Sequence, residues 1–174
     1  LVFLPGVEPG FNMALNALVA HDAPVVLQMP NYAPLAHAPS HRHQPSIELP
    51  FKLDASGEYH TDIAALNTHL HNAGAFLLSN PHNPLGKVFS GEELHMIGQA
   101  CVDHDVLIIS DEIHADILFD DRRHTPIASL SPQIASRTVT LMSASKAYNI
   151  AGLKTAFAVI QDPQLRKHFN AGRL

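Results

Sequence analysis

Six short apolar runs, each bounded by turn-forming residues, most constrain how this chain can fold. Several of them are continuously apolar rather than alternating, as expected of strands that are covered on both faces in a parallel sheet. Segments of helical character lie between them. This order predicts an α/β fold in which helices cover both faces of a mostly parallel central sheet, giving three layers α/β/α. The expected strands are Leu1–Leu4, Val25–Gln28, Ala75–Ser79, Val106–Ser110, Thr138–Met142 and Ala156–Ile160, and the expected helices are Gly10–Ala20, Thr61–Asn72, Ser90–His104 and Pro163–Asn170.

Local signals refine the ends of these elements. Ser90 is well placed as an N-cap, and Glu93 three residues later predicts a complete capping box. The proline-rich segment 33–53 predicts irregular structure with one short strand. The chain begins in an expected buried strand and ends, at Leu174, in an expected helix. We therefore expect residues 1–174 to be one partial domain of a longer protein.

Composition excludes several classes of protein. The chain has 174 residues, 46% of them hydrophobic, which suffices for one domain with a substantial core. The net charge is −5 without a basic stripe, which argues against nucleic acid as a partner. A single cysteine fits a reducing cytosol, and neither a membrane-spanning run nor a signal peptide is evident. We expect a cytoplasmic protein.

Thirteen histidines suggest a metal site at first sight. The closest pairs are His41-x-His43 and His69-x-His71, and neither has the helical i, i+4 spacing or an obvious carboxylate partner. Solvated polar positions explain these residues better. We expect no metal.

Polar residues follow four of the predicted strands directly. In sheets of this kind ligands bind at the carboxyl ends of the strands. The clusters therefore predict one site at that edge. They are Pro5–Glu8, Asn80–Gly86, Asp111–His114 and the segment around Lys146.

Lys146 follows the expected strand Thr138–Met142, and a second cation, Lys154, lies eight positions later. An amine reacts with a carbonyl only after losing its proton, which burial or a cationic neighbour favours. The setting is that of a Schiff-base lysine beside a phosphate; a lone lysine is otherwise a solvated loop residue. Ser143-x-x-Lys146 also matches the nucleophile of penicillin-recognising enzymes, but the partner signatures Ser-Asp-Asn and Lys-Thr-Gly are missing. That interpretation is rejected.

Asn83 and Asp111 are the other candidates. Asn83 lies in a loop with two Asn-Pro steps, which is either a stiff turn or an amide donor directed into the cleft. Asp111 follows an apolar run, so its carboxylate is either a helix N-cap or a partner that holds a proton on a heterocyclic nitrogen. His114, three residues later, lies near Asp111 if the segment turns helically.

Three ordered segments together resemble the class I/II aminotransferase family, enzymes of fold type I that use pyridoxal 5′-phosphate (PLP). Within these segments, the sequences Asp-Glu-Ile-His and Asn-Ile-Ala-Gly-Leu are most similar to the cystathionine β-lyase, or carbon–sulfur lyase, branch. Pro5–Pro9 and Pro30–Pro34 also fit that branch, and the resemblance covers nearly the whole chain. The segments are Asn80–Gly86, Ser110–Asp116 and Ser143–Leu153.

The resemblance implies a role for each candidate. Lys146 would form the Schiff base with PLP and then shuttle the Cα proton of the substrate. Asp111 would keep the pyridine nitrogen protonated. Asn83 would donate to the phenolate oxygen of the ring, and His114 stands where many relatives place a tyrosine that does the same. Tyr32 would stack on the ring.

The phosphate would lie at a helix N-terminus. Two departures from the family pattern concern this group: Lys154 stands where many relatives carry arginine, and Glu8 brings a carboxylate close to the phosphate dianion. The resemblance also implies a cis peptide between Asn83 and Pro84. The residues expected to contact the phosphate are Ser143, Ser145, Lys154, Gly6, Val7 and Glu8.

The resemblance implies the central part of the large PLP-binding domain, without the N-terminal segment and the small domain of complete relatives. The expected reaction is α,β-elimination on cystathionine or a similar S-substituted cysteine, with transamination as the alternative. A third hypothesis is an inactive fragment that only folds or binds cofactor. The expected partners are a small amino-acid substrate and, at full length, a second copy of the chain. The group that binds the substrate carboxylate is expected outside these residues.

Overall fold

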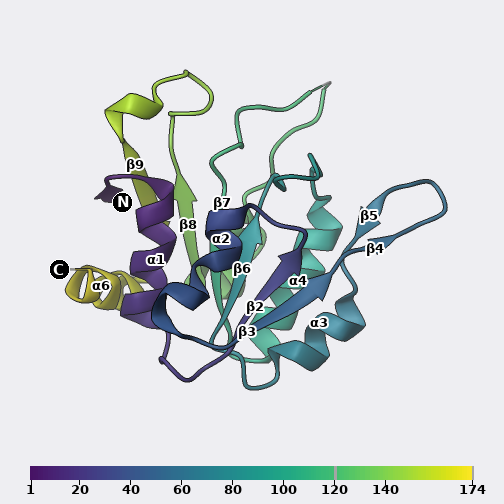
Figure 1. Cartoon of the computed structure of the whole chain (residues 1–174), viewed down its shortest axis with the longest axis horizontal. Coiled ribbons are helices and arrows are strands. Elements are labelled where there is room, and N and C mark those ends of the chain that lie inside the picture. Colours follow the sequence, from purple (N-terminus) through teal and green to yellow (C-terminus); the bar gives the residue numbers. More distant parts are fainter. Residues whose placement is uncertain (120, 174) are drawn as a thin grey trace.

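The centre of the molecule is a seven-stranded sheet (Figure 1). The structure is a computed structural model, and it describes residues 1–119 and 121–173. The strand order is β1-β9-β8-β7-β6-β2-β3. Strands β3, β2, β6, β7 and β8 are parallel, whereas β9 is antiparallel to β8, and β1 to β9. The predicted mostly parallel sheet is thus confirmed. The strands are β1 (Val2–Leu4), β2 (Val25–Met29), β3 (Ser46–Pro50), β6 (Ala75–Ser79), β7 (Leu107–Asp111), β8 (Thr138–Met142) and β9 (Ala156–Ile160).

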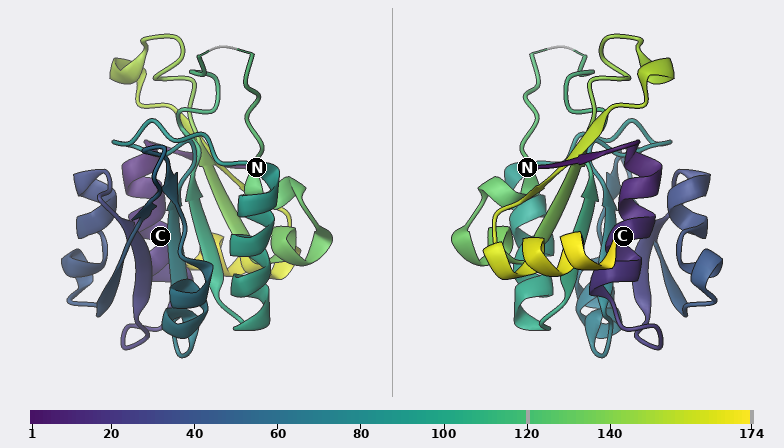
Figure 2. Two further views of the ribbon diagram at one scale, coloured as in Figure 1. Left: turned by 90° about the vertical axis from the view of Figure 1, so that its right-hand side faces the viewer. Right: turned by 90° about the vertical axis from the view of Figure 1, so that its left-hand side faces the viewer.

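Helices cover both faces of this sheet, which confirms the three-layer arrangement (Figure 2). One face is covered by α1 (Val7–Leu18), α2 (Ala33–His37) and α6 (Pro163–Gly172). The other is covered by α3 (Ile63–Leu70), α4 (Gly91–Asp103) and α5 (Pro132–Ser136). No helix in the described residues is long and apolar enough to cross a bilayer. Leu174, expected in a helix, lies outside the described residues.

The continuous apolar runs are explained by the two cores that the sheet separates. Side chains of a strand point alternately to its two faces. Val25 and Leu27 of β2 therefore enter the core beneath α1, whereas Val26 enters the core beneath α3 and α4. Strand β6 does the same, since Leu77 and Leu78 enter opposite cores. A strand covered on both faces needs apolar residues at every position.

Two elements at the N-terminus differ from the prediction. Strand β1 was expected to be buried, but Leu1 and Phe3 are 73% and 74% exposed. The strand lies at the edge of the sheet, where only Val2 and Leu4 face the core. Helix α1 begins at Val7 rather than Gly10. Pro9 fits its first turn because the first N–H groups of a helix have no partner within the helix.

The proline-rich segment is more ordered than expected. It contains α2, the 3₁₀ helix Pro39–Arg42 and the sheet strand β3, which is the expected short strand. Proline is tolerated in the first turn of a helix and on an edge strand, so Pro34 and Pro50 do not prevent either element. The short helix α5 and the 3₁₀ helices Ile127–Ser129 and Ala151–Leu153 were not expected.

The predicted capping box forms only in part. The Ser90 hydroxyl accepts a hydrogen bond from the Glu93 N–H at 3.1 Å, which confirms the N-cap. The Glu93 carboxylate was expected to bond back to Ser90, and this was wrong. It accepts instead from the N–H and hydroxyl of Thr61, at 2.9 and 2.7 Å, and pairs with Lys87 Nζ at 2.7 Å. A long-range ion pair has replaced a local contact.

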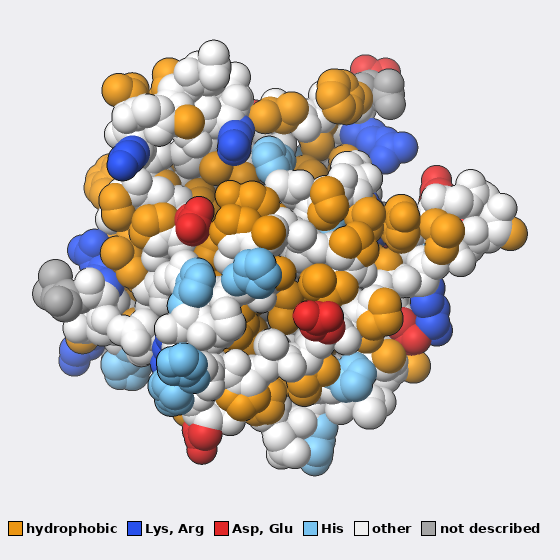
Figure 3. All heavy atoms as spheres, viewed as in Figure 1, with side chains coloured by type: hydrophobic (Ala, Val, Ile, Leu, Met, Phe, Trp, Pro, Cys, Tyr) orange, Lys and Arg blue, Asp and Glu red, His pale blue; other side chains and the backbone are white. Residues whose placement is uncertain are grey.

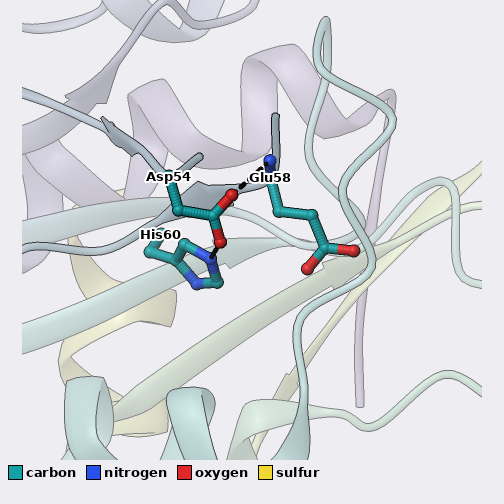
Figure 4. A group of neighbouring side chains, drawn as sticks. All are labelled: Asp54, Glu58 and His60. Atoms are coloured by element: carbon teal, nitrogen blue, oxygen red, sulfur yellow. Dashed lines mark hydrogen bonds and ion pairs between the residues drawn. The ribbon is translucent and has the colours of Figure 1, made fainter. Parts of the chain in front are cut away.

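A small hairpin, β4 (Lys52–Leu53) with β5 (Tyr59–His60), extends from the sheet and carries three possible metal ligands, Asp54, Glu58 and His60 (Figure 4). Asp54 Oδ1 accepts from the N–H and hydroxyl of Ser56 and from the N–H of Glu58, and Oδ2 lies 2.7 Å from His60 Nε2. These bonds, above all that from the Ser56 hydroxyl, hold the pKa of Asp54 well below its usual range. The cluster is accounted for by the turn that it closes.

Candidate active site

A cavity of about 590 Å³ lies at the carboxyl ends of the parallel strands. On the side of the molecule shown in Figure 3, basic, acidic and histidine side chains come close together in the upper part of the view. The structure brings every residue singled out from the sequence to the cavity wall. These residues are Gly6, Val7, Glu8, Tyr32, Asn83, Asp111, His114, Ser143, Ser145, Lys146 and Lys154.

The register of three neighbouring strands explains this convergence. Ser79 at the end of β6 pairs with Asp111 at the end of β7, and Asp111 pairs in turn with Leu141 of β8. The strands end at one level, so the segments that follow them start at the same edge. Residues distant in sequence, Asn83, Asp111 and Lys146, therefore line one cavity.

Asp111 is the most buried charged group of the cavity, with 6% of its surface exposed. Its Oδ1 accepts from the Ile113 N–H at 3.1 Å, which is the one hydrogen bond to this carboxylate within the described residues. Burial raises the pKa of Asp111 to about 6, against the lowering effects of the Ile113 N–H and the Lys146 charge. The alternative of a helix N-cap is wrong, because residues 113–116 form turns instead of the first turn of a helix.

Lys146 lies in the turns that follow β8 and is exposed in this chain. Its position along the cavity wall lets its charge act on two neighbours, since it lowers the pKa of both Asp111 and His114. Lys146 is therefore exposed, as the alternative of a solvated loop lysine predicts, but that alternative does not explain its position on a cavity wall near Asp111. A cation and a buried carboxylate share one cavity.

Asn83 lies in a tight turn. Its N–H donates to the Ser79 hydroxyl at 3.2 Å, and the Gly86 N–H donates to the His82 carbonyl at 2.8 Å. The peptide between Asn83 and Pro84 is cis, as expected, and so are those before Pro30 and Pro81. The expected stiff turn is thus present, and it places Asn83, which is half-buried, on the cavity wall.

His114 and Tyr32 are both affected by burial. Burial, together with the Lys146 charge, lowers the pKa of His114, so the neutral imidazole predominates at neutral pH. Burial raises the pKa of Tyr32, and the charges of Glu8 and Asp111 add to this effect. Each side chain can therefore donate one hydrogen bond at neutral pH.

The N-terminus of α1 meets the segment 143–155 on the cavity wall. Gly6 is the N-cap of α1 and has no side chain to bond the first N–H groups of the helix. The Ser143 hydroxyl donates to the Thr155 carbonyl at 2.5 Å and accepts from the Ser145 N–H at 3.0 Å. Ser143 thus closes the segment on itself. Lys154 is exposed.

Several cavity residues were missed from the sequence, and two of them lie close to each other. Asn12 and His41 both line the cavity, and Asn12 Oδ1 lies 3.2 Å from His41 Nδ1. Asn12 has a signal, because it lies four residues after Glu8 and therefore on the same face of α1. His41 has none, since it reaches the cavity only through the fold of residues 33–42.

A buried acid beside Asp111 was also missed. Glu112 is completely buried, and its carboxylate lies 2.6 Å from His124 Nε2 while accepting from the Ser110 hydroxyl and the Ile127 N–H. These contacts tie residue 112 to the far end of the segment that carries His114. The signal in the sequence was an acid directly after a buried strand.

The fold and this cavity define a three-layer α/β domain with a ligand site at the carboxyl edge of its sheet. The family model for aminotransferase class I and II matches residues 1–173, and the chain belongs to this family. Cystathionine beta-lyase PatB of Bacillus subtilis is 38% identical over 98% of the chain, and kynurenine–oxoglutarate transaminase 1 of Rattus norvegicus is 39% identical over 67%. The chain spans 44% of the first relative and 27% of the second.

A solved structure agrees with this assignment. Cystalysin from Treponema denticola, described as containing a pyridoxal 5′-phosphate cofactor, matches 99% of the chain with a TM-score of 0.95 and 30% identity. The chain covers 44% of that structure. The predicted fold, that of the large domain of PLP-dependent transferases, is confirmed.

Burial of Asp111 predicts a pH dependence of stability. The pKa rises from 3.8 in the unfolded chain to about 6 in the folded chain. Between these values the folded state binds more protons, so stability falls as the pH rises. For the cofactor-free chain, the free energy of unfolding of wild type relative to Asp111→Asn should fall by about 2 kcal/mol between pH 4 and pH 7. Denaturant unfolding at several pH values measures this.

Asp116→Asn is the control, because it removes an exposed carboxylate from the same segment. Its stability profile should run parallel to that of wild type. A constant difference between wild type and Asp111→Asn across this pH range would contradict the buried, proton-binding Asp111.

Proposed function

We propose that the cavity binds PLP and that the complete protein uses it to transform an amino acid. The observation that most supports this proposal is the burial of Asp111, whose carboxylate lies at the cavity wall with one hydrogen bond from the described residues. Such a group is costly unless a cation or a donor pairs with it. A protonated ring nitrogen is both, so the residues present fit this cofactor. The PLP-bearing relative supports the choice.

PLP supplies an aldehyde that condenses with an amine and a ring that accepts electrons when the Cα proton of an amino acid is removed. Lys146 would provide the amine that holds the cofactor and, in its neutral form, would take the proton from Cα of the substrate. Asp111 keeps a proton on the ring nitrogen. The raised pKa of Asp111 reports how strongly the site favours either a proton or a cation there.

Asn83 and His114 donate hydrogen bonds to the phenolate oxygen of the ring. Asn83 fits because the turn that carries it is fixed by main-chain bonds. The main chain that carries its side-chain amide therefore needs little ordering on binding. His114 fits because its neutral ring keeps a single N–H donor, at the place where the tyrosine of many relatives offers a single O–H donor. Tyr32 stacks on the face of the ring.

The phosphate binds where α1 begins. The first N–H groups of a helix point at an anion placed there, and the helix dipole favours its charge. The Ser145 hydroxyl and the Lys154 ammonium complete this group, and Ser143 joins it by turning its hydroxyl proton from the Thr155 carbonyl to the phosphate. Glu8 also lines the cavity, so its negative charge opposes phosphate binding.

The reaction we propose is α,β-elimination on an S-substituted cysteine such as cystathionine. It is supported by the cystathionine beta-lyase that matches 98% of the chain. Transamination is the second candidate, supported by the kynurenine transaminase. Both start with the same removal of the Cα proton. We further propose that the complete protein works in the cytoplasm as a homodimer.

Lys146→Ala should abolish covalent cofactor attachment. The wild-type chain is incubated with PLP, reduced with borohydride and weighed by intact-mass spectrometry. We expect a mass gain of one cofactor for wild type and none for the variant, because Lys154, the other lysine on the cavity wall, is assigned to the phosphate. Lys167→Ala is the matched control, since Lys167 is an exposed lysine of α6 outside the cavity. Equal labelling of wild type and Lys146→Ala would refute the proposed site.

Elimination and transamination are separated with the full-length protein and cystathionine. Elimination releases pyruvate without any keto-acid acceptor, whereas transamination needs one. We expect pyruvate from cystathionine alone, measured by a coupled dehydrogenase. Strict dependence on an added keto acid would contradict the lyase and favour the aminotransferase.

A further inference from the structure

The turn that carries Asn83 is closed by Lys87. The His82 N–H donates to the Lys87 carbonyl at 2.8 Å, and the two residues form an isolated antiparallel bridge. The Gly86 N–H closes the inside of the turn on the His82 carbonyl. The main chain of Lys87 therefore sets where residues 83–86 stand relative to the cavity.

The side chain of Lys87 is held from the opposite direction. Its Nζ lies 2.7 Å from Glu93 Oε2 and donates to the Tyr59 carbonyl at 2.7 Å. The side chains of this ion pair are only 13% and 11% exposed. Burying such a pair removes two charges from water, which offsets most of their attraction. Stability alone is therefore a weak reason for this pair, and geometry is the stronger one.

The other carboxylate oxygen of Glu93 extends the contact to the sheet. Oε1 accepts from both the N–H and the hydroxyl of Thr61, and the Gln28 amide donates to the same hydroxyl at 2.9 Å. Gln28 is 1% exposed and belongs to β2, next to β6 in the sheet. This polar network, Gln28, Thr61, Glu93 and Lys87, connects the base of the Asn83 turn with β2 and with the first turn of α4.

Aromatic packing restrains the same turn. The His82 ring lies edge-on to Phe51, with ring centroids 4.8 Å apart, and Lys87 Nζ lies 5.0 Å from the centroid of Phe89. None of these residues lines the main cavity. Their contacts reach it only through the main chain of the turn.

We propose that Lys87 and Glu93 are positioning residues that hold the Asn83 amide at the place where it donates to PLP. This inference rests on the proposed function. Lys87 and Glu93 do not touch the cofactor cavity, and their effect on the cofactor passes through Asn83.

Two measurements on this chain test the proposal. Without cofactor, hydrogen exchange of the amides in residues 80–88 should be about tenfold faster in Lys87→Met than in wild type, because the turn loses its anchor. With PLP, Lys87→Met should bind about tenfold more weakly than wild type, yet add little to the loss caused by Asn83→Ala in the double variant.

Lys52→Met is the matched control. It breaks the Lys52–Asp62 pair, which has the same 2.7 Å separation but an exposed lysine. It should leave both exchange and PLP affinity unchanged. Should Lys87→Met fail to fold, Glu93→Gln serves instead, because it keeps oxygen and shape at Thr61 while removing the charge opposite Lys87.

The outcomes separate this inference from the proposed function. Unchanged exchange in residues 80–88 would overturn it, and so would losses of PLP affinity that simply add in the double variant. A wild-type chain that does not bind PLP would refute the proposed function and with it the role toward the cofactor. Exchange would then still decide whether Lys87 holds the turn.

Discussion

The site depends on one electrostatic constraint, a carboxylate held at the edge of an apolar sheet. Asp111 ends a strand whose other residues are all buried, and the chain gives it one hydrogen bond within the described residues. Burial therefore raises its pKa, and a cation placed against it would relieve that effect. Three further polar groups, Lys146, His114 and Asn83, line the same cavity as this carboxylate.

The sheet supplies position, and buried polar contacts outside the cavity supply orientation. Parallel strands that end in register place Asp111 between the segments carrying Asn83 and Lys146. Two segments of the cavity wall are each anchored by a buried acid, the Asn83 turn by Glu93 and the segment of His114 by Glu112. Sites of this kind need such support, because an unsupported loop would have to be ordered when ligand binds.

Local patterns sufficed for much of this. Continuous apolar runs predicted the parallel strands, and the polar residues after each run predicted Asn83, Asp111 and Lys146 at one edge. Contacts between distant segments could not be predicted. The Glu93 carboxylate was expected to cap its own helix, but it is bonded to Lys87 and Thr61 instead. His41 reaches the cavity only through the fold of a proline-rich segment that local propensity describes poorly.

The pairing of Asp111 with a ring nitrogen is the central claim, and the affinity for two cofactors tests it most directly. PLP is compared with its analogue in which carbon replaces the ring nitrogen, for wild type and Asp111→Asn. The account predicts that wild type binds PLP roughly tenfold or more tightly than the analogue and that Asp111→Asn loses this preference. Equal affinities in wild type would contradict it.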